Sequence, residues 1–318
     1  MNTAILISPE AKSAYFQDYI DVAQRELGYV MGDIPCRYER IGSLDFLLLE
    51  AHPTQYQQLL RLSCTQGLFS LADGHFIPIP QEADFLLHED FVFGSKYKGK
   101  TNERLTQLLL NVGLATLRPQ TEDISLLDPM AGRGTTLFWG LRYGISSHGI
   151  ELDTLACEDM HRHIKKWTKL HKQKHTFRTG FLGVIPNKRK EGVHLHLTVG
   201  ENSLDAVQGD CKHVSRIYRE KQFHLIISDI PYGVQHVSAQ KTRNPMHILA
   251  ESLPFWKNVL HKDGAIVLSF NSNLPKRDVL VELFAQHGLC DIGFSIPHRM
   301  SESILRDVAI FSLDADAH

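Results

Sequence analysis

The sequence predicts an α/β protein with a mostly parallel sheet and helices on both faces, preceded by a small α+β domain. Three observations predict this class. From residue 96 onward, short apolar runs alternate with helix-compatible segments, as buried parallel strands and their crossover helices do. The last two strand-like runs have only a short link between them, which indicates an antiparallel hairpin. Residues 1–95 mix short strands with helices instead, so we expect two domains, 1–95 and 96–318.

Residues 1–95 contain three strand-like runs and two helical patterns. The strands are expected at Ala4–Ile7, Phe46–Glu50 and Phe76–Ile79, and the helices at Ala11–Leu27 and Gln55–Leu62. Thr54, which follows a proline, is the expected N-cap of the second helix. The Asp73-Gly74 pair lies between apolar residues and predicts the turn of a β-hairpin. No signature in this region names a role for it.

The elements expected after residue 96 form the alternating series. It begins with an amphipathic helix at Asn102–Leu117. The strands are expected at Ser125–Leu127, Ser147–Ile150, Val193–Thr198, Leu225–Ser228 and Ala265–Phe270. The helices between them are expected at Thr135–Tyr143, Thr154–Lys169, Met246–Leu260 and Arg277–His287. The closing hairpin is expected from Gly293–Pro297 and Arg306–Leu313.

Composition argues against several classes of protein. No run approaches the roughly 20 apolar residues that cross a bilayer, and the first residues lack the pattern of a secretory signal. The five cysteines are scattered, with no Cys-x-x-Cys pair. This indicates neither a disulfide framework nor a zinc site, and we expect a reducing cytoplasm. Because the formal net charge is −2, any attraction to nucleic acid must be local.

The first candidate functional segment runs from Asp128 to Thr136 and leads from a strand into a helix. Its two glycines, Gly132 and Gly134, allow a tight turn and a close approach of a ligand to the backbone. Open parallel sheets bind ligands at the carboxyl ends of their strands, which is where this loop falls. Glu151, at the end of the next strand, is placed to reach a ribose.

A glycine-rich loop can also be no more than a tight turn between a strand and a helix. If this loop binds a ligand, a dinucleotide would favour a third glycine where the chain has Leu137. The carboxylate of Asp128 would repel a pyrophosphate and suit a cationic or amino-acid-bearing ligand. The loop therefore favours S-adenosylmethionine.

The second candidate segment, Asp229-Ile230-Pro231-Tyr232-Gly233, ends the fourth strand-like run. A carboxylate there can accept the N–H bonds of an exocyclic base amine and so localise the nitrogen lone pair. Pro231 stiffens the loop, and Tyr232 offers a face for a base turned out of its stack. Such residues are also common in simple turns. Their position one strand pair after the first loop favours catalysis.

The two loops resemble motifs of class I methyltransferases that modify amino groups of nucleic acids. Asp-Pro-Met-Ala-Gly-Arg-Gly-Thr is similar to their Asp-Pro-x-x-Gly-Ser-Gly-Thr motif, and Asp-Ile-Pro-Tyr-Gly to their Asp/Asn-Pro-Pro-Tyr/Phe motif. Residues 95–318 most resemble the tRNA guanine-N2 methyltransferases, a group often joined to a THUMP domain. Residues 1–95 are shorter than a full THUMP assembly, and Arg133 and Trp139-Gly140 depart from the family pattern.

The resemblance implies a Rossmann-like sheet of seven strands, an S-adenosylmethionine cofactor and a set of site residues. The catalytic residues would be Asp229, Pro231 and Tyr232. The cofactor-binding residues would be Thr101, Asp128, Met130, Ala131, Gly132, Gly134, Thr135, Glu151, Leu152, Glu201, Asn202 and Asp229. Lys100 is implicated together with Thr101, because the family segment that matches them lies over the cofactor. Residues 1–95 would be a candidate RNA-binding domain.

A basic stretch is the candidate contact with a phosphate backbone. Between Met160 and Lys190 the chain has ten Lys or Arg and no Asp or Glu, and the part from Lys172 to Lys190 reads as an insertion. Charge runs are also common on solvated faces. The weak substrate-binding candidates are Lys165, Lys166, Lys169, Lys241 and Arg243. The histidines in the stretch lack a His-x-x-x-His pair with an acid, so we expect no metal site.

These observations leave three functions open. The leading hypothesis is methylation of an exocyclic amine of a base in RNA, with guanine N2 of tRNA as the target. The same loops would serve adenine N6 or cytosine N4 in DNA or rRNA. A third hypothesis is a non-catalytic RNA-binding protein that keeps the fold. RNA, and tRNA in particular, is the expected partner; a membrane and a metal are not expected.

Overall fold

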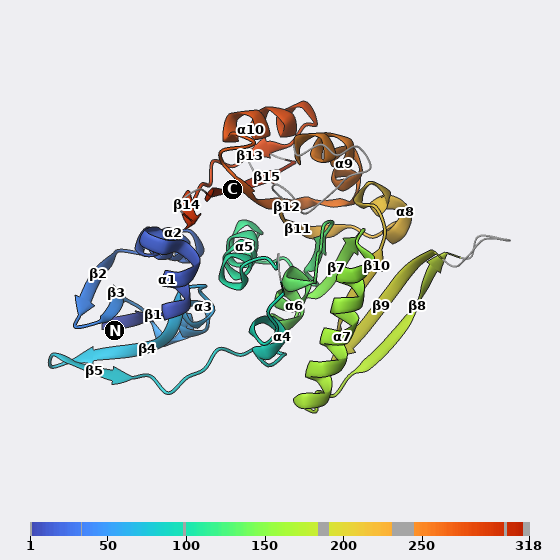
Figure 1. Ribbon diagram of the computed structural model, residues 1–318. Helices are drawn as coiled ribbons and strands as arrows, with labels where there is room; N and C mark the ends of the chain where they lie inside the picture. The colour runs from blue at the N-terminus through green and yellow to red at the C-terminus, as the bar shows by residue number, and fades with distance from the viewer. Residues whose placement is uncertain are drawn as a thin grey trace.

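Two sheets organise the chain (Figure 1). The computed structural model describes residues 2–32, 34–97, 100–183, 191–230, 245–301 and 304–313. Within these ranges a five-stranded antiparallel sheet forms the N-terminal region, and a ten-stranded sheet with five parallel strands at its centre forms the rest. The predicted α/β class and the separate N-terminal α+β region are therefore confirmed.

The N-terminal sheet has the strand order β2-β3-β1-β4-β5. Its strands are β1 (Asn2–Ile7), β2 (Cys36–Ile41), β3 (Leu44–Glu50), β4 (Thr65–Ala72) and β5 (His75–Pro78). The predicted hairpin turn joins β4 to β5, with Asp73 and Gly74 at φ values of 51° and 77°. Positive φ at both central residues matches the twist of the flanking strands.

Helices form at both predicted places in this region, but their bounds differ from those predicted. The single helix expected at Ala11–Leu27 is divided into α1 (Pro9–Tyr15) and α2 (Tyr19–Met31) by a 3-10 turn, where Phe16 has a φ of 50°. Such a φ cannot continue a right-handed helix. The second helix is the 3-10 turn Pro53–Gln55 followed by α3 (Tyr56–Leu60).

Thr54 does not cap that second helix. His52 is the N-cap, because its ring Nδ1 accepts from the Thr54 N–H at 3.4 Å and its own N–H donates to the Gln55 side chain at 2.8 Å. This reciprocal arrangement satisfies two backbone donors at once. A histidine is an uncommon cap, so sequence patterns favour the threonine.

The helix predicted at Asn102–Leu117 is confirmed as α5 (Glu103–Thr116), with Asn102 accepting from two N–H groups of the first turn. In Figure 1, α5 lies between the N-terminal sheet and the large sheet. One hydrophobic cluster runs from Ile5 through Leu108 to Leu225, so the two regions share a core.

The large sheet has the order β13-β15-β12-β11-β6-β7-β10-β9-β8, with β14 paired to β15. Its strands are β6 (Ser125–Asp128), β7 (Ser146–Glu151), β8 (Thr176–Gly183), β9 (Glu191–Val199), β10 (Asn202–Gln208), β11 (Phe223–Asp229), β12 (Leu260–Asn271), β13 (Cys290–Asp291), β14 (His298–Ser301) and β15 (Ile304–Ser312). The seven strands from β10 to β13 form the expected seven-stranded sheet with an antiparallel end.

Two strand assignments need correction. The segment Val193–Thr198 lies in β9, which runs antiparallel to both neighbours, and the third parallel strand is β10. The insertion predicted at Lys172–Lys190 contains β8, which pairs with β9 at the edge of the sheet, and its part 184–190 lies outside the described residues. In the closing hairpin, β14 begins after Gly293–Pro297, so only its second arm was placed correctly.

Helices cover both faces of the large sheet, as predicted. They are α4 (Asp90–Phe93), α6 (Thr135–Arg142), α7 (Thr154–Leu170), α8 (Val214–Tyr218), α9 (Pro245–Val259) and α10 (Arg277–Gln286). Successive residues of β11 join different cores, because Ile227 packs with α5 and α6 whereas Ile226 packs with α9 and α10. Within the described ranges no helix has the length and apolarity to cross a membrane.

Candidate active site

The candidate site lies where three adjacent parallel strands end. Asp128 ends β6, Glu151 ends β7 and Asp229 ends β11, and β6 pairs with both of the other strands. Carboxyl ends of parallel strands share one edge of the sheet. The structure thus brings the first loop, the predicted ribose carboxylate and the start of the second loop to a single edge.

Backbone hydrogen bonds fix the first loop in a single shape. The Gly132 N–H donates to Oε2 of Glu151 at 2.6 Å, and the Met130 N–H donates to Oδ1 of Asp128 at 3.0 Å. The Ala131 N–H donates to the carbonyl of residue 150 at 2.9 Å. Gly132 and Gly134 have φ values of 53° and 82°, a backbone conformation that glycine adopts at lower cost than other residues.

Asp128 connects the two candidate loops. The Ser228 hydroxyl donates to Oδ1 of Asp128 at 3.0 Å, and Ser228 directly precedes Asp229. Asp128 is 3% exposed, and burial raises the pKa of its carboxyl to about 7. The Asp128 side chain therefore holds the loop through hydrogen bonds, and its carboxyl group changes protonation state near neutral pH.

The residues after β7 combine a carboxylate with an exposed apolar surface. Oε1 of Glu151 accepts from the Asp153 N–H at 2.7 Å, and Asp153 in turn caps α7. Leu152 is 65% exposed although it is large and apolar. Thr135 is buried at the start of α6. An apolar side chain next to a buried carboxylate suits a ligand with a flat ring and a polyhydroxyl group.

Asp229 is held by an ion pair that the sequence did not reveal. Nη1 of Arg306, on β15, lies 2.7 Å from Oδ1 of Asp229, and both side chains are largely buried. The Ile230 N–H donates to the Ser269 carbonyl at 2.9 Å and continues the strand pairing. The predicted residues Pro231, Tyr232, Lys241 and Arg243 lie outside the described residues.

Arg133, which departs from the family pattern, has a structural partner. Its Nε donates to Oδ2 of Asp159 on α7 at 2.8 Å, and its guanidinium lies 5.4 Å from the Tyr97 ring centroid. Lys100 has a similar role, because its ammonium group binds the Val92 and Ser95 carbonyls. It also pairs with Glu103 at 2.7 Å. Thr101 is half-buried beside this contact.

Glu201 and Asn202 were predicted to reach the cofactor, and the structure places both at the opposite end of β10 from the candidate site. Glu201 lies in the turn before β10 and Asn202 begins the strand, whereas the edge that carries Asp128, Glu151 and Asp229 is reached at Gln208, which pairs with Glu151. Six residues of strand separate Asn202 from Gln208, roughly 20 Å. The error follows from taking β9 for the third parallel strand.

The acidic residue that follows the third parallel strand, where one was expected near the adenine, is Asp210. The Gly209 N–H donates to the Glu151 carbonyl at 2.9 Å, so the Gly209-Asp210 turn lies at the edge beside β7. Asp210 caps the 3-10 turn that follows by accepting from the Lys212 N–H at 2.9 Å. A Gly-Asp pair directly after an alternating strand is the sequence signal that could have identified it.

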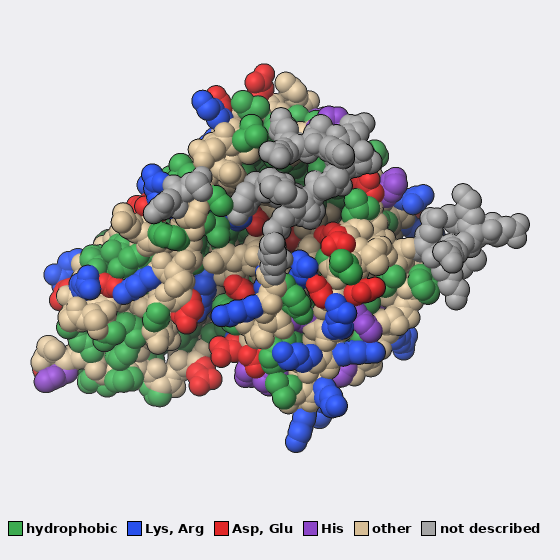
Figure 2. Space-filling model, viewed as in Figure 1, with side chains coloured by type: hydrophobic (Ala, Val, Ile, Leu, Met, Phe, Trp, Pro, Cys, Tyr) green, Lys and Arg blue, Asp and Glu red, His purple; other side chains and the backbone are tan. Residues whose placement is uncertain are grey.

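The basic candidates on α7 lie away from this edge. Lys165, Lys166 and Lys169 are exposed, and Figure 2 shows Lys and Arg side chains gathered over α7. Fifteen residues of helix separate Lys169 from Thr154, roughly 22 Å along the axis. The buried side of the same helix carries His163 and Trp167. The lysines therefore form a surface beside the site and do not line it.

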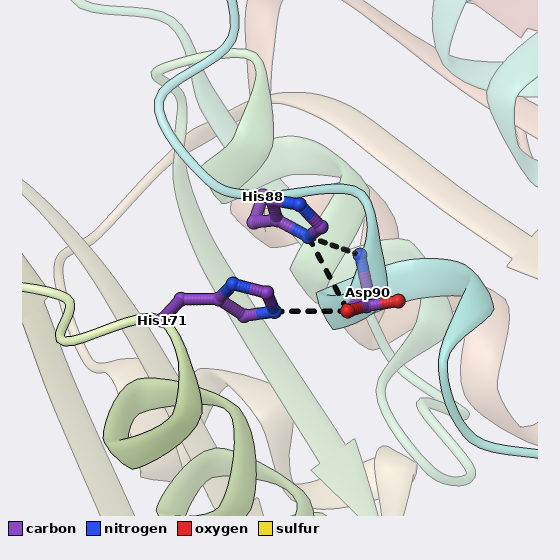
Figure 3. A group of neighbouring side chains, drawn as sticks. All are labelled: His88, Asp90 and His171. Carbon is purple, nitrogen blue, oxygen red and sulfur yellow. Dashed lines mark hydrogen bonds and ion pairs between the residues drawn. The ribbon is translucent and has the colours of Figure 1, made fainter.

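Two histidine clusters have the composition of a metal site. Figure 3 shows the first, in which Asp90 contacts His171 at 2.9 Å and His88 at 3.5 Å. The His88 and His171 rings are stacked, with centroids 3.7 Å apart and planes at 17°. An imidazole lone pair lies in its ring plane, so stacked rings cannot direct theirs to one ion. The second cluster is His194, His196 and Asp205.

Comparison with known proteins finds no matching family model and no matching curated protein. Solved structures do match. An rRNA methylase of Streptococcus thermophilus is 10% identical with a TM-score of 0.39, over 67% of this chain and 97% of that one. A methyltransferase of Pyrococcus furiosus is 14% identical with a TM-score of 0.42, over 71% and 92%. A TehB-like SAM-dependent methyltransferase of Corynebacterium glutamicum is 16% identical with a TM-score of 0.36, over 60% and 81%. Function must therefore be argued from this chain's own residues.

Proposed function

We propose that the chain is a cytoplasmic methyltransferase that uses S-adenosylmethionine to methylate an exocyclic amine of a base in RNA, with guanine N2 of tRNA as the target. The Ser228–Asp128 hydrogen bond is the observation that carries this proposal. It joins the end of β11 to the cofactor loop, so that Asp229 lies next to the place where a methyl donor would be held.

The residues at this edge suit a cationic ligand. Glu151, Asp210 and Asp229 follow or end three strands of the sheet, and the cofactor-loop N–H groups of Met130 and Gly132 are already bound by the side chains of Asp128 and Glu151. S-adenosylmethionine carries a sulfonium and an ammonium group and supplies an activated methyl group when bound. Glu151 would hold the ribose, and Leu152 would pack on the adenine.

Asp229 would act on the target amine. Its Oδ1 is bound by Arg306, which leaves Oδ2 as the oxygen to accept an amine N–H. Accepting that bond localises the nitrogen lone pair and stabilises the positive charge that develops on nitrogen. Arg306 fixes the carboxylate orientation, and Pro231 and Tyr232 would hold the base. The exposed lysines of α7 would bind the phosphate backbone, and residues 1–95 would extend this RNA contact.

Activity on bulk tRNA with labelled S-adenosylmethionine tests the proposal, with nucleoside analysis of the product. We expect N2-methylguanosine from the wild-type chain. Asp229→Ala should abolish turnover and leave cofactor binding by calorimetry within a few fold. Asp278→Ala, an exposed carboxylate on α10, is the matched control and should keep full activity.

Each other outcome would contradict part of the proposal. N6-methyladenosine or N4-methylcytidine as product would overturn the guanine assignment. If the chain bound the cofactor but methylated none of tRNA, rRNA and DNA, the assignment of methyltransferase activity would be overturned. If Asp229→Ala stayed active, the role given to that carboxylate would be wrong.

A further inference from the structure

We propose that His194, His196 and Asp205 form a binding site for one divalent transition-metal ion, with Zn²⁺ as the natural occupant. The cluster lies within β9 and β10, and the proposed methyl transfer uses none of its three residues. Imidazole nitrogens and a carboxylate oxygen are the ligand set that Zn²⁺ takes in proteins. The inference does not depend on the proposed function.

The strand register brings the three side chains together. His196 lies directly opposite Asp205, and His194 lies opposite Val207, one diagonal step away. Residues two apart on a strand share a face, so both rings lie on the side of Asp205. Oδ1 of Asp205 lies 2.9 Å from Nε2 of His194 and 2.7 Å from Nδ1 of His196.

The ring orientations allow both histidines to bind one ion. Their centroids are 6.1 Å apart and their planes meet at 52°, so the in-plane lone pairs can converge. Tetrahedral Zn²⁺ with bonds of about 2.0–2.1 Å needs ligand atoms roughly 3.3 Å apart. The carboxylate–imidazole contacts must therefore open by about half an ångström. The histidine side chains are 32% and 35% exposed, which gives them room to do so.

Neighbouring hydroxyl groups hold the ligands in place. The Thr198 hydroxyl lies 3.1 Å from Nε2 of His196, the ring nitrogen that would not bind the ion. The Ser203 hydroxyl donates to Oδ2 of Asp205 at 3.2 Å, again the atom not used as the ligand. Such contacts orient the ligands of metal sites and tune their affinity. His148 is the nearest further imidazole, but its Nε2 accepts from Lys221 at 2.6 Å.

An ion at this position would join β9 to β10. The β8–β9 hairpin lies at the edge of the large sheet and is attached to it through β10. A cross-strand metal would therefore fix the register of the whole hairpin. Three protein ligands also leave one tetrahedral position open to water or to another small ligand.

Titration of the chelator-treated full-length chain with Co²⁺ and Zn²⁺ tests the proposal. We expect visible absorption of tetrahedral Co²⁺ at one equivalent, its displacement by Zn²⁺, and a rise in melting temperature with Zn²⁺. His194→Ala and His196→Ala should lose the absorption and the rise. Asp205→Asn, which keeps the shape of the side chain, should weaken binding at least tenfold. Thr198→Val should weaken it by about tenfold.

The first histidine cluster supplies the matched control. The His88→Ala and His171→Ala variants should each bind one equivalent of Co²⁺ or Zn²⁺ with unchanged affinity, because the stacked His88 and His171 rings do not form a metal site. The proposal is overturned if the wild-type chain binds neither ion. It is also overturned if the His88 or His171 variant loses the spectrum while the His194 and His196 variants keep it. Circular dichroism of each apo variant separates loss of ligand from loss of fold.

Discussion

Asp128 and Asp229 lie at the same sheet edge in different surroundings. The groups that donate to Asp128 are neutral and include the Thr136 and Ser228 hydroxyls and the Met130 N–H, whereas Asp229 is paired with the Arg306 guanidinium. Burial without a cation raises the pKa of Asp128 to about 7. The Asp128 carboxyl can thus be protonated while it accepts the hydrogen bonds of the loop, whereas Asp229 keeps a charged partner and, under the proposed function, would face the substrate. Such a division is typical of sites that use two carboxyl groups.

The raised pKa of Asp128 predicts a pH-dependent stability. A carboxyl group whose pKa is raised in the folded state stabilises the fold fully below its unfolded pKa of 3.8, and this contribution is lost as the pH rises through about 7. Asparagine stays neutral throughout. We expect Asp128→Asn to gain stability relative to wild type between pH 4 and 8, by up to about 4 kcal/mol. Urea unfolding of wild type and Asp128→Asn at pH 4 and at pH 8 measures this difference in the free energy of unfolding. A difference that does not change with pH would contradict it.

The positions of single residues could be predicted from the sequence where they depend on the local backbone, and the roles given to these residues stay predictions. Gly132, Gly134 and Glu151 were placed correctly at the sheet edge, because a strand–loop–helix pattern is contained in a short segment. Arg133 could not be explained in this way. Its partner Asp159 is 26 residues away and is brought close by the folded position of α7. The partner of Asp229 is still more distant, at Arg306.

At the scale of elements, the alternation of apolar and polar residues predicted where the strands lie. It did not predict which strands pair with each other. The β9 and β10 segments are both half-buried and both alternate, so the sequence does not distinguish a parallel strand from an antiparallel one. Choosing β9 moved the predicted adenine contact to Glu201, at the wrong end of β10. The seven-stranded sheet was implied by the family resemblance, whereas the apolar runs of β6, β11 and β12 allowed these three parallel strands to be located from the sequence itself.

The close approach of β7 to the first loop predicts a sensitive glycine. A Cβ on Gly149 would lie 2.6 Å from Leu137 and 2.9 Å from Ala131. We expect Gly149→Ala to lower the free energy of unfolding by about 1–3 kcal/mol, because well-packed elements must move apart. It should also weaken S-adenosylmethionine binding in calorimetry, since Ala131 belongs to the loop. Gly180→Ala on β8 is the control, with no atom within 4 Å, and should change neither. Equal effects of the two substitutions would contradict the packing argument.

At the scale of the whole molecule, a buried polar network joins the N-terminal region to the large sheet. Glu26 on α2 accepts from the Ser63 N–H at 2.9 Å and from the Asn111 side chain on α5 at 2.7 Å. Asn111 accepts in turn from the Tyr143 hydroxyl at 2.7 Å, just after α6. Glu26 is fully buried, which raises its pKa. No sequence pattern links residues so far apart, so the predicted boundary near residue 95 could not reveal this connection.

Shared burial and this network predict that both regions unfold together. Asn111→Ala removes a donor to a buried carboxyl, which we expect to cost about 1–3 kcal/mol. Because the network connects the two regions, the free energy of unfolding should fall by the same amount in both. Fluorescence of Trp139, Trp167 and Trp256 reports on the large sheet, and alkylation of the buried Cys64, located by mass spectrometry, reports on the N-terminal region. In urea the two midpoints should coincide and shift together in the variant. Alkylation of Cys64 at lower urea than the fluorescence change would mean that residues 1–95 unfold as an independent domain.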